Sequence, residues 1–324
     1  MNNLLFLATD HGLITIERSR DRWIERFRAL NEIHATCVVA HDGIALAGTT
    51  EGVFRSDDLG KTWQPRNEGL SIPHVRWLRF HHEDRDLVLA GTQPGGIFIS
   101  HDSGDTWREC PEVASLRDEK GWYLPYAPEA GCVRGLAFWG DRAYAAVEQG
   151  GLLISDDRGE HWRLVNGSNG DPRVEEPTGN IHVDVHSVVV HPDGPDEVFA
   201  ATAGGLYQSR DGGDTWVNLY PAYVRDLHVD RGLIQHIVHG PADGVARGGR
   251  IEETFDGGRT WLAASFGLET PWPRRMVERF ARFDIFLLAV LSDGEVYAAT
   301  PPKLVWERVL ERFPHVKALS PMYS

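Results

Sequence analysis

The octapeptide SRDGGDTW at residues 209–216 follows a pattern, S-x-D-x-G-x-T-W, that recurs along this chain. Two other octapeptides match it fully, and two match it with one substitution each, His161 in place of Thr and Thr254 in place of Ser. The recurrence of one short pattern at near-regular intervals is typical of a repeat protein. The other copies span Ser56–Trp63, Ser100–Trp107, Ser155–Trp162 and Thr254–Trp261.

The pattern has the chemistry of a tight hairpin turn. Glycine adopts backbone conformations with positive φ, and the Asp carboxylate accepts backbone N–H groups of the turn. The Trp at the end of each copy provides a large apolar anchor between repeats. We therefore favour a structural role for the repeated carboxylates over the alternative, a catalytic one. They are Asp58, Asp102, Asp157, Asp211 and Asp256.

Each repeat contains four short segments with the alternation of β-strands, and the Trp begins the fourth of them. A four-stranded repeat is a propeller blade. The Trp position recurs seven times, so we predict an all-β fold, a seven-bladed β-propeller of four-stranded antiparallel blades that forms a single domain over residues 1–324. The anchors are Trp23, Trp63, Trp107, Trp162, Trp216, Trp261 and Trp306.

The two ends of the sequence complement each other. The chain begins at the second strand of a blade, whereas Val316–Leu319 matches the first strand of the other repeats. We predict that this C-terminal strand pairs with Leu4–Ala8 and closes the ring. Such closure covers strand edges that an open array would expose to aggregation.

The octapeptide is the motif called the Asp box or BNR repeat, and on that ground the chain resembles the Asp-box β-propellers of the sialidase-like superfamily. Sialidases have six blades, an arginine triad, a tyrosine nucleophile helped by a glutamate, and an acid/base aspartate. This chain lacks their Arg-Ile-Pro motif and has seven anchors, so the resemblance does not imply sialidase activity. It is closer to the seven-bladed Ycf48-type assembly factors, which bind protein, and to single halves of xyloglucan-cleaving enzymes, whose paired aspartates have no assignable counterpart here.

Composition restricts the class of partner. A formal net charge of −14 argues against binding to nucleic acid or to an anionic membrane, so any cationic site must be local. No apolar run reaches the roughly 18 to 20 residues of a membrane helix, and the N-terminus lacks the basic region of a signal peptide. Cys37, Cys110 and Cys132 have no paired spacing, which suits a reducing compartment. We expect a cytoplasmic monomer or small homo-oligomer without membrane insertion.

Three long connections are the default functional candidates. Pro111–Gly131 and Asn166–Asp184 join the fourth strand of one blade to the first strand of the next, and His239–Arg250 joins a second strand to a third. In propellers of this type these connections share one face, opposite the repeated turns, with the mouth of the central channel. Flexible lids and passive linkers both remain open.

When the first strands of the blades are aligned by their place in the repeat, the second residue of each aligned pair is basic. The innermost strand of a blade faces the channel, so these residues predict a cationic collar around its mouth, suited to a carboxylate, phosphate or sulfate. The alternative is that each cation pairs with a nearby acid, such as Asp184, Asp226 or Glu278, and only holds neighbouring blades together. The predicted collar residues are His34, Arg76, Arg134, His186, Arg225, Arg275 and Lys317.

The residues of this face receive expected roles. Arg76, Arg134, Arg225, Arg275 and Lys317 are the expected anion ligands, because cationic side chains bind carboxylates and phosphates, and Trp122 is placed to stack on a sugar ring. His34 and His186 exchange protons near neutral pH and lean neutral among crowded cations. With Glu148 and Tyr123, these two imidazoles form the candidate catalytic set. Glu51, Gln93, Tyr126 and Asp293 border the same mouth.

The segment His182-Val183-Asp184-Val185-His186 is a candidate metal site. A period of two places His182, Asp184 and His186 on one strand face, where they could bind a divalent metal and leave a position open. The alternative is a pair of hydrogen-bonded histidines without metal, and no other cofactor is predicted.

Two functional classes follow. The first is a pocket protein that binds an anionic small molecule or acidic glycan at the collar, and this class includes a hydrolase or lyase of glycosidase type. The second is a non-catalytic scaffold that binds an acidic segment of a protein partner. The chain has no G-x-S-x-G, H-E-x-x-H or G-x-x-x-x-G-K-[ST] run, which disfavours serine-hydrolase, zincin and P-loop chemistry. An enclosed pocket favours the first class, and a broad flat face favours the second.

Overall fold

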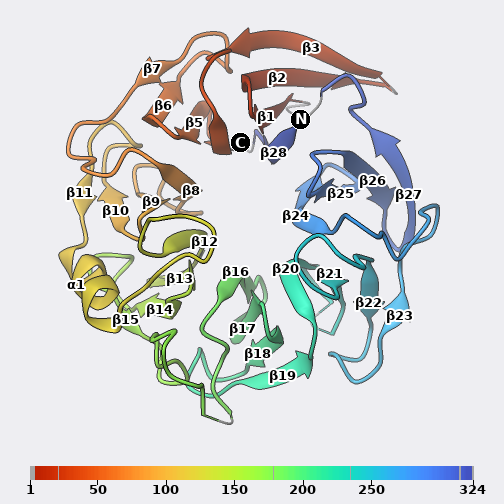
Figure 1. Cartoon of the computed structure of the whole chain (residues 1–324). Coiled ribbons are helices and arrows are strands. Elements are labelled where there is room, and N and C mark those ends of the chain that lie inside the picture. Colours follow the sequence, from red (N-terminus) through yellow and green to blue (C-terminus); the bar gives the residue numbers. More distant parts are fainter. Residues whose placement is uncertain (1–3, 21, 178, 234, 314, 323–324) are drawn as a thin grey trace.

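The computed structural model describes residues 4–20, 22–177, 179–233, 235–313 and 315–322. Seven four-stranded antiparallel sheets radiate around a common axis (Figure 1), which confirms the predicted all-β, seven-bladed propeller. Each sheet is a blade whose innermost strand is the first of its repeat.

Blade 1 contains β28 (Val316–Pro321), β1 (Leu4–Thr9), β2 (Gly12–Ser19) and β3 (Arg22–Ala29). Blade 2 contains β4 (Ala35–His41), β5 (Ile44–Thr49), β6 (Gly52–Ser56) and β7 (Gln64–Pro65), and blade 3 contains β8 (Val75–Phe80), β9 (Val88–Thr92), β10 (Ile97–Ser100) and β11 (Arg108–Glu109). Blade 4 contains β12 (Cys132–Trp139), β13 (Arg142–Glu148), β14 (Gly151–Ser155) and β15 (Arg163–Leu164). Blades 5 to 7 contain β16 (Val185–His191), β17 (Gly194–Thr202), β18 (Gly205–Ser209) and β19 (Val217–Tyr220); β20 (Tyr223–Val229), β21 (Ile237–Ala242), β22 (Glu252–Thr254) and β23 (Leu262–Ala263); and β24 (Val277–Phe283), β25 (Phe286–Leu291), β26 (Val296–Thr300) and β27 (Lys303–Val309).

Blade 1 combines both ends of the chain, as predicted. Strand β28 (Val316–Pro321) pairs antiparallel with β1, with Leu7 opposite Leu319 and Ala8 opposite Ala318. The amide of Met322 also donates to the carbonyl oxygen of Leu4 at 3.1 Å. The last strand of the chain therefore supplies the innermost strand of the first blade.

Glycines in the second strands allow neighbouring blades to pack closely. A Cβ added to Gly91 in β9 would lie 2.4 Å from the side chain of Val133 in the next blade. A Cβ added to Gly240 in β21 would lie 2.4 Å from the side chain of Val277. Each inner-strand valine therefore occupies the space that the glycine leaves, and a larger residue there would push the two blades apart.

The repeated turns share one hydrogen-bond pattern. Asp211 Oδ1 accepts from the Ser209 hydroxyl at 2.7 Å and from the Thr215 amide at 2.9 Å, while Oδ2 accepts from the Thr215 hydroxyl at 2.6 Å. These bonds lower the pKa of Asp211 to about 2. Where the turn has His161, the imidazole Nδ1 lies 2.7 Å from Asp157 Oδ2 in the place of the hydroxyl. The repeated carboxylates thus serve as acceptors inside their own turns.

The anchoring indoles are buried in five of the seven blades. Trp63, Trp162 and Trp216 donate their indole N–H to the carbonyl of a glycine in their own turn, at 3.0 to 3.2 Å. Trp306 donates instead to Ala264 of the preceding blade at 2.7 Å. Trp23 is only half-buried because it lies in the exposed outer strand of blade 1.

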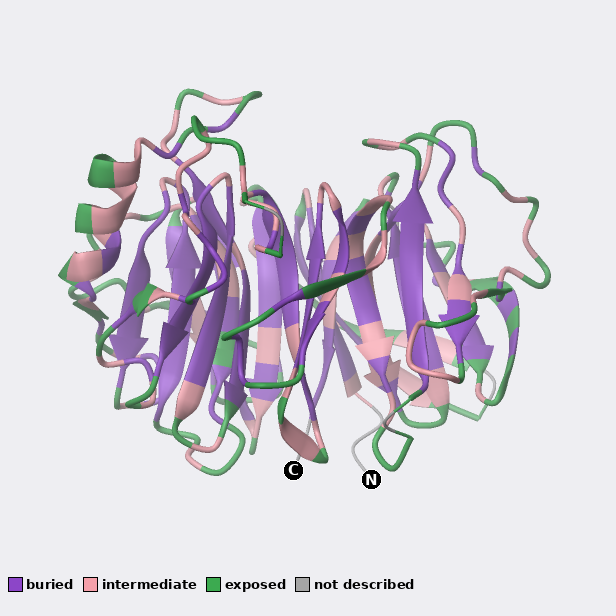
Figure 2. Ribbon diagram, turned by 90° about the horizontal axis from the view of Figure 1, so that it is seen from below, coloured by how far each residue is buried: buried purple, intermediate pink, exposed green. Residues whose placement is uncertain are grey.

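The connections divide between two faces of the ring. The repeated turns join third to fourth strands on the face that also carries both termini, at the bottom of Figure 2. The long connections lie on the opposite face, here called the insertion face, as predicted. The two insertions also contact each other, because the Trp122 indole donates to the Gly170 carbonyl at 2.9 Å. His239 belongs to β21, so the third connection is shorter than predicted and covers residues 243–251.

The first insertion begins with a helix that the sequence analysis does not predict, α1 (Pro111–Lys120). Pro111 starts it, and Gly121 ends it with φ of 62°, which is the usual distribution of these two residues at helix ends. Among the described residues, no helix is long and apolar enough to cross a membrane.

Candidate functional site

A β-bulge interrupts the inner strand of every blade near the insertion face. In β8, Val75 lies opposite Thr92 and Trp77 lies opposite Gly91, so Arg76 between them has no partner in the ladder. A bulge of this kind re-aims the side chain of the unpaired residue. The bulged residues are Thr36, Arg76, Arg134, His186, Arg225 with Asp226, Glu278 and Lys317.

This ring of bulges corrects the predicted collar in two blades. In β4 the bulge falls at Thr36, two residues after His34, and in β24 it falls at Glu278, three residues after Arg275. His34 and Arg275 precede these strands. The predicted strand positions were wrong there because β4 and β24 begin two and three residues later than the alignment by repeat position placed them, although His34 still reaches the channel mouth. In β24 the inner-strand valine of Val277-Glu278 identifies the correct position, whereas β4 has Ala35 in the place of this valine.

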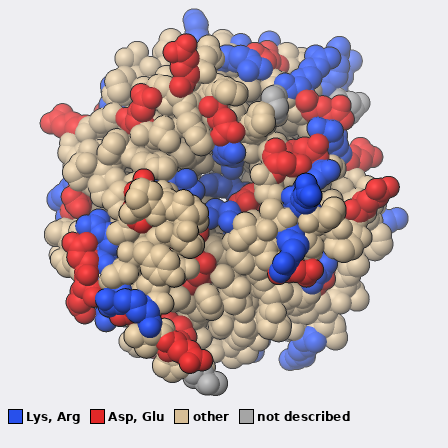
Figure 3. Space-filling view, in the orientation of Figure 1, with Lys and Arg blue, Asp and Glu red and all other residues tan. Residues whose placement is uncertain are grey.

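The bulged side chains surround a cavity at the mouth of the channel. The cavity has a volume of about 230 Å³, and Figure 3 shows Lys and Arg side chains inside the central hollow of this face. Four basic bulge residues and Glu278 line it, joined by His34 and by Arg279, which the sequence analysis missed. Five predicted collar residues therefore meet here, namely His34, Arg76, Arg134, Arg225 and Lys317.

Two of these arginines bind carboxylates. Arg225 Nη1 lies 2.8 Å and 3.1 Å from the two carboxylate oxygens of Glu278. Arg134 Nη1 lies 3.0 Å from Glu148 Oε2, and its Nη2 lies 3.6 Å from Glu278. These ion pairs connect blades 4, 6 and 7. For Arg134 and Arg225 the structure matches the alternative considered above, cations that hold blades together.

Arg76 differs from them. It is half-buried in the same cavity, and it forms no ion pair with a carboxylate in the part of the chain that the structure describes. Burial, which is the larger cause, and the charge of Arg76, which is the second, lower the pKa of His74 to about 4. Arg76 is thus a cation at the channel mouth without a carboxylate partner among the described residues.

Lys317 and His34 share one carboxylate at the edge of the cavity. Lys317 Nζ lies 3.2 Å from Asp10 Oδ2, and His34 Nε2 lies 3.1 Å from Asp10 Oδ1. Burial lowers the pKa of His34, and the charges of Lys317 and Arg76 add to this effect against the attraction of Asp10. The imidazole of His34 is therefore neutral near pH 7, as expected among crowded cations.

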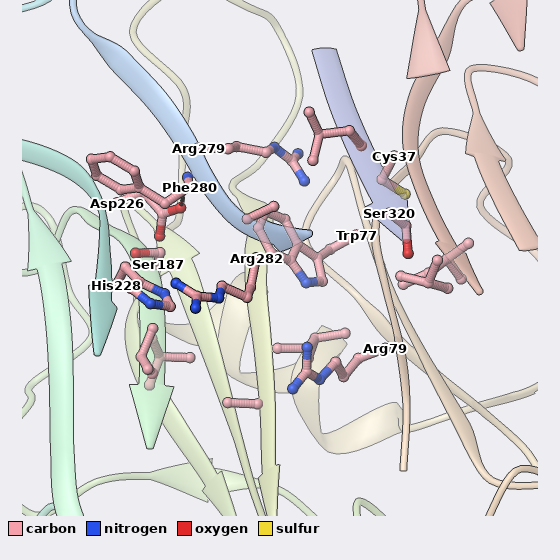
Figure 4. Close-up of a pocket in the computed structure, with 18 of the residues that line it drawn as sticks. Cys37, Trp77, Arg79, Ser187, Asp226, His228, Arg279, Phe280, Arg282 and Ser320 are labelled. Atoms are coloured by element: carbon pink, nitrogen blue, oxygen red, sulfur yellow. Dashed lines mark hydrogen bonds between the residues drawn. The ribbon is translucent and has the colours of Figure 1, made fainter. Parts of the chain in front are cut away.

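The channel continues below the mouth into a second cavity of about 310 Å³, drawn in Figure 4. Arg279 lines both cavities, with its guanidinium carbon 4.0 Å from the centre of the Trp77 ring. Burial lowers the pKa of Arg279 to about 10, so it still carries its charge at neutral pH. Arg79, Arg282 and His228 extend the basic lining toward the other face.

Two aromatic residues of the first insertion lie apart from this cavity. Trp122 is buried against glycines of blades 3 and 4, so its ring is not free to stack on a sugar. Tyr123 is exposed and does not line the cavity. A third aromatic residue of this insertion, Tyr126, contacts a candidate catalytic residue, because its hydroxyl donates to Glu148 Oε2 at 2.7 Å. Arg134 lowers the pKa of the buried Glu148 against the effect of burial.

The remaining predicted residues lie elsewhere. Arg275 is on the insertion face but pairs with Glu295 at 2.7 Å and with Asp293 at 3.3 Å, outside the cavity. His186 is buried, and its Nδ1 lies 2.7 Å from the Val224 carbonyl oxygen. His182 points away from the predicted metal set, because its Nδ1 accepts from the Asp184 amide at 3.0 Å. Glu148 takes its place, and one ligand atom each of Glu148, Asp184 and His186 lies within 4.8 Å of the others.

Comparison with known proteins supports the fold. No protein-family model matches the chain. It is 21% identical, over 89% of its length, to a probable oligoxyloglucan-reducing end-specific xyloglucanase of Neosartorya fischeri, of which it spans 39%. Among solved structures it is similar to the GH74 xyloglucanase of Xanthomonas campestris, with a TM-score of 0.62, 18% identity and coverage of 86% of this chain and 45% of that one.

A different match covers both chains almost completely. The structure of YCF48 bound to D1 peptide aligns with a TM-score of 0.63 and 15% identity, over 92% of this chain and 90% of that one. At these identities the likeness is one of fold. The chain therefore has the propeller seen in xyloglucanases and in YCF48.

Proposed function

We propose that this protein binds an anionic small molecule or an acidic sugar at the mouth of its channel. The observation that carries the proposal is Arg76, which faces the cavity without a carboxylate partner in the described chain, beside Lys317 and Arg279. A partly buried charge without a counter-charge is costly, and a bound carboxylate or phosphate supplies one. The low-dielectric walls of the cavity strengthen this attraction.

The size of the cavity favours a small ligand. A volume of about 230 Å³ accommodates one acidic group and a small body, whereas a protein partner needs a broad surface. Arg76 offers a planar fork for two parallel hydrogen bonds, and Lys317 adds an ammonium group that also contacts Asp10.

The carboxylates at the mouth support binding better than glycoside hydrolysis. A glycosidase needs one carboxyl group that stays protonated to act as an acid, and a second that acts as base or nucleophile. Glu278 accepts from Arg225, while Glu148 accepts from Arg134, which lowers the pKa of Glu148, so an arginine already engages each carboxylate. A hydrolase or lyase activity therefore has less support than binding.

The scaffold alternative has one observation in its favour. The fold match to YCF48 bound to D1 peptide covers nearly the whole of both chains, whereas the xyloglucanase match covers less than half of the enzyme. An acidic segment of a protein partner could place a single carboxylate in the same cavity. Both alternatives use Arg76, and the size of the ligand distinguishes them.

Single arginine substitutions test the proposal. We expect Arg76→Ala to weaken binding by about 1.5 to 3 kcal/mol, the contribution of charged hydrogen bonds, without lowering the melting temperature. We expect Arg134→Ala to lower the melting temperature, because it leaves Glu148 buried without its cation. Affinity for phosphate, citrate, glucuronate and an acidic peptide is measured by calorimetry, and melting is followed by circular dichroism.

Arg274→Ala is the matched control, because Arg274 is exposed on the same face and does not line the cavity. Binding that survives Arg76→Ala, or that is lost equally in Arg274→Ala, contradicts the proposal. Binding of the peptide alone, lost in Arg76→Ala, selects the scaffold alternative.

A further inference from the structure

Three buried side chains meet between blades 4 and 5, under the first insertion. Glu148 ends β13, Asp184 ends the second insertion, and His186 is the bulged residue of β16. One ligand atom of each lies within 4.8 Å of the other two, and all three residues are at least nine-tenths buried. Tyr126 of the first insertion covers the group through its hydrogen bond to Glu148. The two longest insertions of the chain therefore both contribute to this cluster.

A backbone carbonyl on the side away from the cluster fixes the orientation of the His186 ring. Its Nδ1 lies 2.7 Å from the carbonyl oxygen of Val224, and a carbonyl oxygen only accepts, so Nδ1 carries a hydrogen. The other ring nitrogen, Nε2, faces the cluster and has a lone pair for a metal when it carries no hydrogen. A backbone carbonyl that holds the far nitrogen of an imidazole is the usual support of a histidine ligand to a metal.

Two atoms that face each other in the cluster form no hydrogen bond of ordinary geometry among the described residues. His186 Nε2 lies 3.4 Å from Asp184 Oδ1, and both atoms are buried without a hydrogen-bond partner among the described residues. If Nε2 carries no hydrogen, both atoms are acceptors, and two buried acceptors that face each other repel unless a cation or a proton lies between them. The cluster thus has the donors and the charge of a cation site.

We propose that Glu148, Asp184 and His186 bind one divalent transition-metal ion. An imidazole with two carboxylates suits Zn²⁺, Mn²⁺, Fe²⁺ or Co²⁺, whereas Mg²⁺ and Ca²⁺ prefer oxygen ligands alone. Three protein ligands leave coordination positions open for water or a ligand. This set differs from that predicted by sequence, with Glu148 in place of His182.

The surroundings balance the charge of the ion. The two carboxylates match the two charges of the metal, while the charge of Arg134 is shared with Glu278 at 3.6 Å. Arg134 also holds Glu148 Oε2 at 3.0 Å, so it orients this ligand from the side of the channel. The metal site would therefore lie directly beside the cationic cavity but have its own ligands.

Metal titration of the full-length protein tests the site. After removal of metals with a chelator, Zn²⁺, Mn²⁺, Co²⁺ and Mg²⁺ are titrated separately by calorimetry, and the Co²⁺ complex is followed by its visible absorption. We expect one transition-metal ion per chain, weaker binding of Mg²⁺ and a higher melting temperature with Zn²⁺. His186→Asn and Asp184→Asn should each weaken Zn²⁺ binding at least about tenfold and abolish the Co²⁺ spectrum.

His34→Asn is the matched control, since it removes an imidazole of the same face that lies outside the cluster. It should bind Zn²⁺ as the wild type does. Glu148→Gln provides a third variant if the others fold poorly. The proposal is overturned if the wild type binds neither Zn²⁺ nor Co²⁺. That result would mean that Nε2 of His186 carries a proton and contacts Asp184 through it. Equal binding by the wild type and the folded Asp184→Asn or Glu148→Gln variants also overturns it.

Discussion

At the residue scale, Asp226 makes stability depend on pH. It shares the bulge of β20 with Arg225, and its Oδ2 accepts from the Phe280 amide at 2.7 Å. Burial raises the pKa of this carboxyl group from 3.8 to about 6. The folded protein therefore holds a proton there more tightly than the unfolded chain, so the stability from Asp226 is full below about pH 4 and is lost as the pH rises through 6.

We expect Asp226→Asn to gain stability relative to the wild type as the pH rises from 3.5 to 7.5, by about 3 kcal/mol for the full rise in pKa. Urea unfolding at a series of pH values measures this difference. Asp141→Asn, whose side chain is exposed, is the control and should show no such trend. A constant difference between Asp226→Asn and the wild type across the range would show that Asp226 has an ordinary pKa.

The candidate site was partly predictable at this scale. Basic residues that follow an inner-strand valine gave Arg76, Arg134, Arg225 and Lys317, because the repeat carries the bulge to the same place in each blade. Glu278 was named only as an acid that could pair with these cations, because an alignment on shared positive charge does not place an acid among the bulged residues. The sequence also could not show which arginine lacks a partner, since Glu148 and Glu278 come from other parts of the chain.

At the scale of the element, the repeated turns contribute to the stability of the fold rather than to ligand binding. Asp211→Ala removes the acceptor for the Ser209 hydroxyl, the Thr215 amide and the Thr215 hydroxyl in one turn. We expect a loss of about 1 to 2 kcal/mol in the free energy of unfolding, as for other side chains that satisfy backbone amides. Chemical denaturation measures it, and affinity at the channel mouth should not change.

Arg210→Ala is the control in the same turn, because Arg210 is exposed and adjacent to Asp211. It should leave stability within about 0.5 kcal/mol of the wild type. A loss of ligand binding in Asp211→Ala without a loss of stability would instead support the catalytic reading of these carboxylates.

Elements that repeat along the sequence could be predicted, and elements that occur only once could not. Alternating strands and the repeated octapeptide predicted the blades and the face that carries each connection. The helix α1 has no apolar stripe, and only Pro111 and Gly121 mark its ends. The contact of Tyr126 with Glu148 depends on the path of an irregular loop, which local sequence does not determine.

At the scale of the whole molecule, the ring depends on β28. Deletion of residues 316–322 removes the inner strand of blade 1 and exposes the edge of β1. We expect the truncated protein to lose its cooperative melting transition and to aggregate, because an apolar edge strand pairs with other chains. Circular dichroism and size-exclusion chromatography measure the two effects.

A permuted chain separates the loss of the strand from the loss of chain length. Because the Met322 amide reaches the Leu4 carbonyl at 3.1 Å, residues 315–322 can be moved in front of residue 4 through a short linker as a hairpin. This chain should melt within a few degrees of the wild type. Poor folding of the permuted chain, or cooperative melting of the truncated one, would contradict a closure that works through β28 alone.

The pairing of β1 with β28 also sets the order in which the protein forms during translation. Leu7 and Leu319 face each other from opposite ends of a chain of 324 residues. At about 5 to 20 residues per second, β1 leaves the ribosome roughly 15 to 60 s before its partner. During that interval Leu5, Phe6, Leu7 and Ala8, all buried in the finished ring, lack their inner neighbour. Until β28 is made, the apolar edge of β1 is therefore open to pairing with other strands.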